Sequence, residues 1–115
     1  ARLLFLMRKV ETLMCAAVKQ RASTTCGSNT RVVSDETGSH VYLHGHKIAK
    51  VAPDGTLSIN SCGWETVTTK SRLNALIDCF SEFVSDGIYQ KDFTWWVIDN
   101  GETKLFPSNS WYSFT

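Results

Sequence analysis

The stretch HVYLHGHKIAKVAPDGTLSIN, residues 40–60, indicates the fold class most clearly. It contains three short runs that are typical of strands, separated by turn signals: HVYLH (40–44), KIAKV (47–51) and TLSIN (56–60). In the last run Leu57 and Ile59 alternate with polar residues. This alternation is typical of a sheet that is buried on one face and wet on the other.

Turn residues connect these runs into a meander. Gly45 and His46 are expected to reverse the chain after the first run. APDG (52–55) is a candidate type I turn, because its proline presets φ. A further run, RVVS (31–34), precedes the stretch. The sequence therefore predicts a four-stranded antiparallel meander over residues 31–60.

A helix is predicted after the meander, over residues 69–85. Its apolar residues recur at a spacing of three and four, and Gly87 is placed to end it. The expected buried stripe consists of Leu73, Leu76, Ile77, Phe80, Phe83 and Val84.

An amphipathic helix of about five turns is predicted before the meander, over residues 3–21. Its expected buried face consists of Leu3, Leu6, Val10, Leu13, Met14 and Ala17. Arg8, Thr12 and Lys19 fall on the opposite side, and the Ser/Thr/Gly/Asn-rich segment ASTTCGSN (22–29) is expected to be a loop.

A β-hairpin is predicted at the C-terminal end, over residues 92–106. The runs DFTWWVI (92–98) and ETKLF (102–106) flank Asn100-Gly101, which is the dipeptide most typical of a two-residue hairpin turn. The whole pattern predicts a single α+β domain over residues 1–115. In it a four-stranded antiparallel meander and a C-terminal β-hairpin have two helices packed on one face.

Composition limits the function classes. The chain has 115 residues, 43% of them hydrophobic and 20% charged, which favours one folded domain over a disordered chain. The net charge of +1 gives no overall field that would attract nucleic acid or a membrane, although residues 1–31 carry six Lys/Arg and one Glu. The apolar opening ARLLFLM is too short for a signal sequence, and no apolar run is long enough to span a bilayer. We expect a soluble, cytoplasmic protein, and whether residues 1–6 are native stays open.

Four cysteines are present without any C-x-x-C spacing. Cys15 and Cys79 fall in predicted helices and are expected to be core residues. Cys26 and Cys62 fall in predicted loops and could pair. Free thiols are the favoured interpretation, and the disulfide state of this pair stays open.

The start of the second helix, within GWETVTTKSRLNAL (63–76), carries more hydroxyls and cations than a helix start needs. Thr68 or Thr69 could cap the helix, while Lys70 and Arg72 oppose its dipole unless an anion lies nearby. A phosphate bound there would resolve this conflict. The candidate phosphate- or nucleic-acid-binding residues are Trp64, Thr66, Thr68, Thr69, Lys70, Arg72 and Asn74. The alternative is a capped helix with two solvated cations and Trp64 in the core.

Signals for other chemistry are weak. His40, His44 and His46 lack a nearby cysteine pair, so we predict no metal site. The chain contains no G-x-S-x-G, P-loop or G-x-G-x-x-G motif, and a turn explains Asp35 and Glu36 better than acid–base catalysis. We predict no cofactor and no catalytic residues.

Adjacent tryptophans mark a possible partner surface. Trp95 and Trp96 are expected to point to opposite faces of a strand, so at most one belongs to a single core. Trp96 and Trp111 are therefore the candidate partner-binding residues. Packing of the C-terminal tail over its own sheet is the alternative.

Three motifs occur together in order: LHGxxIA (43–49), GWxTxTTxxRLN (63–74) and QKDFxW (90–95). With them, residues 30–106 resemble a widespread family of small, uncharacterised tailed-bacteriophage proteins. The resemblance implies a bacteriophage or prophage origin and a setting in the cytoplasm of an infected bacterium, and it implies no activity. Among the matching positions, Thr66, Arg72 and Asn74 are the hardest to explain by packing.

Three functional hypotheses follow. The first is a phage accessory protein that binds nucleic acid or another phosphate-bearing ligand at Thr68–Arg72, with a footprint widened by Arg8, Lys9, Lys19 and Arg21. The second is a protein-binding module that modulates a host or anti-phage defence factor. The third and least favoured is an enzyme acting on a phosphorylated small molecule. The oligomeric state stays open.

Overall fold

The computed structural model describes residues 8–81 and 85–114. These residues form two helices, α1 (Lys9–Gln20) and α2 (Val67–Phe80), and nine strands. The strands are β1 (Thr24–Cys26), β2 (Thr30–Asp35), β3 (Gly38–Leu43), β4 (His46–Val51), β5 (Leu57–Ile59), β6 (Gly87–Lys91), β7 (Thr94–Asp99), β8 (Glu102–Leu105) and β9 (Tyr112–Ser113). The predicted α+β class is confirmed.

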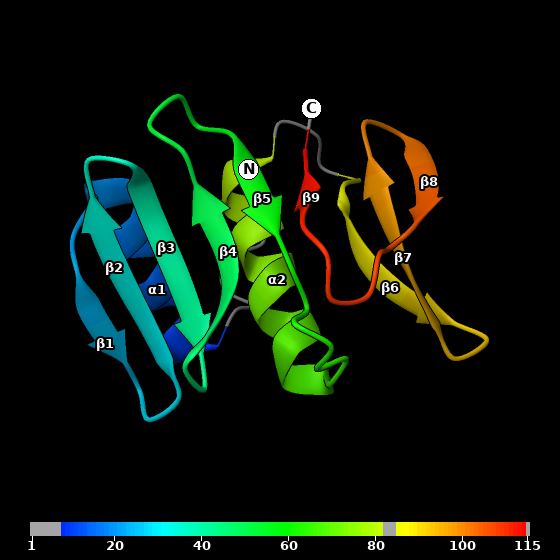
Figure 1. Ribbon diagram of the computed structural model, residues 1–115, viewed down its shortest axis with the longest axis horizontal. Helices are drawn as coiled ribbons and strands as arrows, with labels where there is room; N and C mark the ends of the chain where they lie inside the picture. Colours follow the sequence, from blue (N-terminus) through cyan, green and yellow to red (C-terminus); the bar gives the residue numbers. More distant parts are fainter. Residues whose placement is uncertain (1–7, 82–84, 115) are drawn as a thin grey trace.

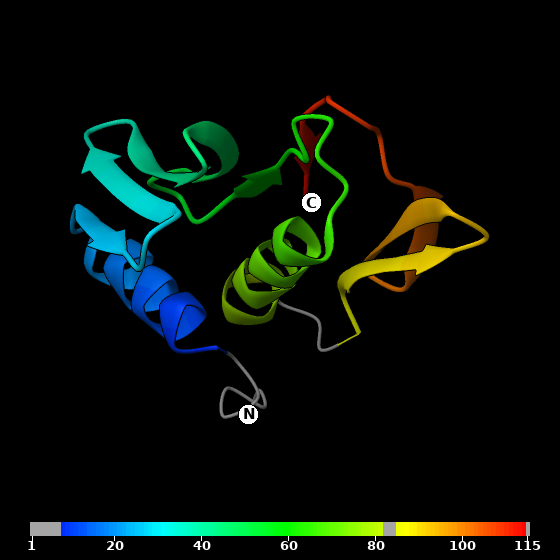
Figure 2. The same cartoon turned by 90° about the horizontal axis from the view of Figure 1, so that it is seen from below.

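The strands form two antiparallel sheets. The larger has six strands in the order β1-β2-β3-β4-β5-β9, and the smaller has three in the order β6-β7-β8. Helix α1 contacts β1, β2 and β3, and α2 contacts β4, β5 and β6. Both helices cover the same face of the six-stranded sheet, as predicted (Figures 1 and 2). The smaller sheet lies beyond α2.

The core fills the space between the helices and the larger sheet. Met14 from α1, Leu73 and Ile77 from α2, and Val41 and Ile59 from the sheet are each fully buried. Burial of each such side chain contributes about 1.5–3 kcal/mol of transfer free energy, so this layer is the main source of stability. Neither described helix is long and apolar enough to cross a bilayer.

The predicted meander corresponds to β2–β5, but the sheet is wider than predicted. Residues 24–26 were expected to lie in a loop, yet they pair as β1 with β2. Tyr112–Ser113 pairs with β5 as β9. Tyr112 pairs there with Ile59, which lies more than fifty positions earlier in the chain. Both strands are too short to show an alternation of their own, and tertiary pairing decides their conformation.

Turn chemistry fixes the hairpins. The chain reverses at His44-Gly45 and not at Gly45-His46 as predicted, because His44 and Gly45 have positive φ values of 51° and 81°. A type I′ hairpin turn requires positive φ at both central residues. The predicted turn at 52–55 is confirmed by a 2.9 Å hydrogen bond from the Gly55 N–H to the Ala52 carbonyl. Asn100-Gly101 forms the predicted tight turn between β7 and β8, with φ values of 53° and 81°.

Helix α1 differs from the predicted helix at 3–21 in its bounds and its buried face. It covers Lys9–Gln20, and residues 3–7 lie outside the described residues. Leu13 was expected to be buried but is 47% exposed, whereas Glu11 is only 3% exposed. The Glu11 carboxylate faces α2, where it forms a buried ion pair of 2.7 Å with the Arg72 guanidinium.

Helix α2 begins two residues before the predicted 69 and ends at Phe80 instead of Ser85. Thr66, not Thr68 or Thr69, is the N-cap, and its side chain accepts a hydrogen bond from the Thr69 N–H. Leu73, Leu76 and Ile77 are buried as predicted. Phe83 and Val84 lie outside the described residues, and Gly87 begins β6 instead of ending the helix.

The predicted hairpin at 92–106 is present as β7 and β8, and β6 adds a third strand to it. Trp95 is 3% exposed and faces the core. Trp96 is half-buried on the opposite face, which confirms that the two indoles point apart. The four cysteines all lie in the described part of the chain, and none of them forms a disulfide there.

Candidate functional site

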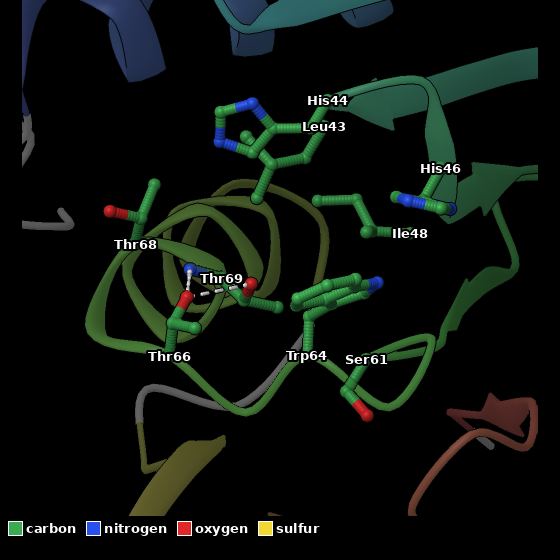
Figure 3. A pocket seen from close by; sticks show the side chains of 9 residues that line it. All are labelled: Leu43, His44, His46, Ile48, Ser61, Trp64, Thr66, Thr68 and Thr69. Carbon is green, nitrogen blue, oxygen red and sulfur yellow. Dashed lines mark hydrogen bonds between the residues drawn. The ribbon is translucent and has the colours of Figure 1, made fainter.

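A pocket of about 370 Å³ opens between the β3–β4 turn and the start of α2 (Figure 3). Its walls combine apolar side chains, two imidazoles, an indole and several hydroxyls: Leu43, His44, His46, Ile48, Ser61, Trp64, Thr66, Thr68 and Thr69. We call it the Trp64 pocket. A concave site with an apolar floor and a few converging polar groups is the usual form of a small-ligand site.

Trp64 is 57% exposed at the mouth of the pocket. Its indole lies 5.8 Å from the imidazole of His46, with an angle of 34° between the two rings. Figure 3 shows the indole below His46 and Ile48, with Thr66 and Thr68 on the side of α2. Trp64 is therefore not a core residue, and the alternative that placed its indole in the core is wrong on this point.

The loop before α2 holds the indole in place. Cys62 and Gly63 have positive φ values of 56° and 78°, and the Trp64 N–H donates a 2.9 Å hydrogen bond to the Ser61 carbonyl. Burial raises the pKa of the Cys62 thiol, whose Sγ donates to the Lys47 carbonyl. The exposed ring is thus carried on a hydrogen-bonded turn, and such a ring loses little conformational freedom when a ligand stacks on it.

The threonines at the start of α2 have two roles, which are capping the helix and lining the Trp64 pocket. The Thr66 hydroxyl lies 3.2 Å from the Thr69 N–H and 3.1 Å from the Thr69 hydroxyl, and Thr69 is 1% exposed. Thr68 is half-buried on the pocket wall. The first turn of α2 carries no acidic residue, so no carboxylate of that turn complements the positive end of the helix dipole.

Arg72 lies in a buried network and not in the pocket. Its guanidinium donates to the Glu11 carboxylate at 2.7 Å and to the Thr30 hydroxyl at 3.0 Å, and Arg72 is 4% exposed. The Ser71 hydroxyl donates to the same carboxylate. The charge of Arg72 is therefore already neutralised within the fold. A glutamate inside the apolar pattern of the first helix was the sequence signal for this pair.

Asn74 also has a structural contact. Its amide accepts from the Ile88 N–H at 2.7 Å and donates to the Ile88 carbonyl at 2.9 Å, which ties α2 to β6. Lys70 is half-buried on the first turn of α2 and does not line the pocket. Of the seven candidate residues at this helix start, the pocket brings together Trp64, Thr66, Thr68 and Thr69.

Sequence reasoning did not assign the imidazoles to this site. His44 lies in the β3–β4 turn and His46 begins β4, and both are exposed. His40 lies apart, with its Nε2 3.0 Å from the Thr37 hydroxyl. The motifs LHGxxIA and GWxTxTTxxRLN were the available signal, because the pocket joins residues from both. Within residues 8–81 and 85–114, no group of three or more His, Cys, Asp or Glu side chains is placed to hold a metal ion.

The two candidate partner-binding tryptophans lie on different surfaces. Trp111 is 47% exposed beside the larger sheet, with the Lys47 ammonium 5.8 Å from the centre of its ring. Trp96 lies on the outer face of the smaller sheet, where Tyr89 and Leu105 are its cross-strand neighbours.

Comparison with known proteins identifies the family. A family model described as Kyanoviridae Gp96 protein matches residues 7–113, which is nearly the whole chain. No curated protein and no solved structure matches the chain. The chain therefore belongs to the Kyanoviridae Gp96 protein family, a family of phage proteins.

Proposed function

We propose that this phage protein binds single-stranded nucleic acid in the cytoplasm of an infected bacterium, and that the Trp64 pocket takes one nucleotide of the strand. The observation that carries this proposal is the exposed indole of Trp64, held against His46 at the mouth of a pocket of about 370 Å³. Indole rings that bind unpaired bases contribute about 1–3 kcal/mol per base, whatever the sequence.

The surroundings of the indole suit a nucleotide. A base stacked on Trp64 places its phosphate near the hydroxyls of Thr66 and Thr68 and the positive end of α2. Lys70 is the cation nearest in sequence to these two threonines, and it does not belong to the Arg72 network. Arg72 and Asn74 support the pocket by fixing α2 against α1 and β6, and they do not contact the ligand in this proposal.

Fluorescence anisotropy with a labelled single strand of about 12 nucleotides, within the ~4–16 nucleotides of known single-strand sites, tests the proposal. We expect Trp64→Ala to weaken binding by about 5- to 150-fold, which corresponds to ~1–3 kcal/mol of stacking. Trp64→Phe should retain part of the affinity. Trp96→Ala is the matched control, because it removes an indole on the smaller sheet that does not line the Trp64 pocket. Wild-type protein that binds no strand at low salt would contradict the proposal.

A protein-binding module that modulates a host or defence factor is the second candidate. The outer face of the smaller sheet favours it, because Leu105 is 61% exposed beside Trp96 and Phe93 is 96% exposed at the β6–β7 turn. A protein held there would survive nuclease treatment, would be lost on Trp96→Ala and would be kept on Trp64→Ala.

A further inference from the structure

One face of the six-stranded sheet is open. Both helices lie against the other face, and in the described part of the chain no element covers strands β1–β5 on this side (Figures 1 and 2). Alternate residues of each strand point to this face. Val32 and Val41 are fully buried towards the helices, so their neighbours Arg31 and Tyr42 belong to the open face.

Four side chains form a row across this face, in which cations and aromatic rings alternate. Arg31 pairs in register with Tyr42, and Tyr42 pairs with Lys47 on the next strand. The Arg31 guanidinium lies 5.5 Å from the centre of the Tyr42 ring, and the Lys47 ammonium lies 5.8 Å from the centre of the Trp111 ring. We call Arg31, Tyr42, Lys47 and Trp111 the basic–aromatic row.

The open face is more basic than the protein as a whole. Lys50, opposite His40 in register, adds a third cation to Arg31 and Lys47. The carboxylate that register places on this face is Asp35, at the far end of β2, where it binds the N–H of Thr37. A net charge of +1 for the whole chain therefore hides a local excess of positive charge, which suits a polyanion.

The row also meets the Trp64 pocket. Arg31 and Tyr42 line a second, shallower hollow of about 390 Å³ at the same end of the sheet, and His44 lines both hollows. The β1–β2 turn, the β3–β4 turn and the start of α2 lie at this end (Figure 1). A ligand can thus contact the row and the pocket together without crossing a covered surface.

We infer that the basic–aromatic row is the binding surface for the rest of the single strand whose one nucleotide occupies the Trp64 pocket. This inference rests on the proposed function and identifies the surface that the remainder of the bound strand contacts. Arg31 and Lys47 contact backbone phosphates, and the rings of Tyr42 and Trp111 stack on unpaired bases. A duplex hides its base faces, so it offers phosphates to the cations but nothing to the rings. The partner is therefore a single strand.

The test compares two double variants that lose the same charge. Arg31→Gln/Lys47→Gln removes two cations of the row. Lys9→Gln/Lys19→Gln removes two solvent-exposed cations of α1, which lies against the opposite face of the larger sheet. Anisotropy of the labelled strand is measured from low to physiological salt for both variants, Trp64→Ala and the wild type. Melting temperatures near the wild-type value show that the substitutions leave the fold intact.

We expect the row variant to bind at least tenfold more weakly than the α1 variant. The slope of log K against log salt should fall by about 1.4, because each phosphate contact of a single strand contributes ~0.7. Tyr42→Leu should weaken binding of the single strand and leave any binding of a duplex of the same sequence unchanged. An unlabelled acidic peptide should not compete.

The outcomes for the row variant and for Trp64→Ala distinguish the row inference from the pocket proposal. If Trp64→Ala weakens binding but the row variant binds like the α1 variant, the row inference is wrong and the pocket proposal stands. If the row variant weakens binding and Trp64→Ala does not, the row is supported and the pocket is wrongly assigned. Equal affinity for the duplex, or full competition by the acidic peptide, overturns the single-strand assignment. No binding to any strand overturns both proposals.

Discussion

Arg72 is the residue whose environment differs most from the sequence interpretation. The sequence placed its charge at a helix start, opposed to the dipole, and so favoured a bound phosphate. In the fold the guanidinium reaches across to α1 and pairs with Glu11, and both side chains are 4% exposed. The glutamate within the apolar pattern of the first helix indicates a buried charge, but its partner could not be identified from the sequence, because the two residues are 61 positions apart.

The Glu11–Arg72 pair gives a stability prediction. Arg72→Ala should lower the free energy of unfolding by about 3–5 kcal/mol, because it leaves the Glu11 carboxylate buried without its cation. Lys70→Ala on the same helix should change it by less than ~0.5 kcal/mol. Urea-induced unfolding measures both. Equal small losses for the two variants would show that Glu11 does not depend on Arg72.

Asp35 gives a prediction that depends on pH. The hydroxyl and the N–H of Thr37 donate to its carboxylate and hold the pKa of Asp35 below its usual value. Because the folded pKa is depressed, the stabilisation is present above the unfolded pKa and is lost as pH falls through the folded pKa. Thr37→Val should raise the pKa of Asp35 towards the usual value for an aspartate. A carbon-detected NMR titration measures this pKa, and an unchanged value would contradict the assigned role of the hydroxyl.

At the scale of elements, α2 joins the two sheets. Its Leu73, Leu76 and Ile77 side chains are fully buried, and Asn74 binds both backbone groups of Ile88 on β6. An asparagine that pairs with an N–H and a carbonyl of one residue continues the hydrogen-bond pattern of a strand edge. The smaller sheet is therefore fixed to the helix by polar contacts as well as by packing.

Asn74→Ala should loosen this junction. The substitution leaves the Ile88 N–H and carbonyl unpaired, which costs about 1–3 kcal/mol. Hydrogen exchange of the Ile88 amide should accelerate, while the amides of β3 and β4 in the larger sheet keep their protection. Asn74→Asp, which keeps the acceptor and loses the donor, should give a smaller effect. Unchanged exchange at Ile88 would contradict the role of Asn74 as a tie.

The elements that the sequence predicted have strong local patterns. The meander, the apolar stripe of α2 and the Asn100-Gly101 hairpin each follow a local period or a specific turn. The missed strands β1, β6 and β9 have two to five residues each and depend on their pairing partners. The bounds of α2 were misplaced because Thr66, Thr68 and Thr69 are equally good caps in sequence, and tertiary contacts decide which one is used.

At the scale of the whole molecule, the layers separate a covered face from an open one. The basic residues of α1, which the sequence suggested as part of a footprint, lie on the helix side of the larger sheet (Figure 2). Arg31 and Lys47 are separated in sequence by a hairpin, and only the strand register places both beside Tyr42. The basic–aromatic row is thus a product of topology, and composition with a net charge of +1 could not reveal it.

The most direct test of single-strand binding uses the four indole N–H signals of ¹⁵N-labelled protein, because the four tryptophans occupy four distinct places. Adding a single strand of about 12 nucleotides, within the ~4–16 of known sites, should shift the signals of Trp64 and Trp111. The signals of buried Trp95 and of Trp96 on the smaller sheet should stay in place. If Trp64 and Trp111 do not move, or if Trp96 alone moves, nucleic acid does not bind where we propose.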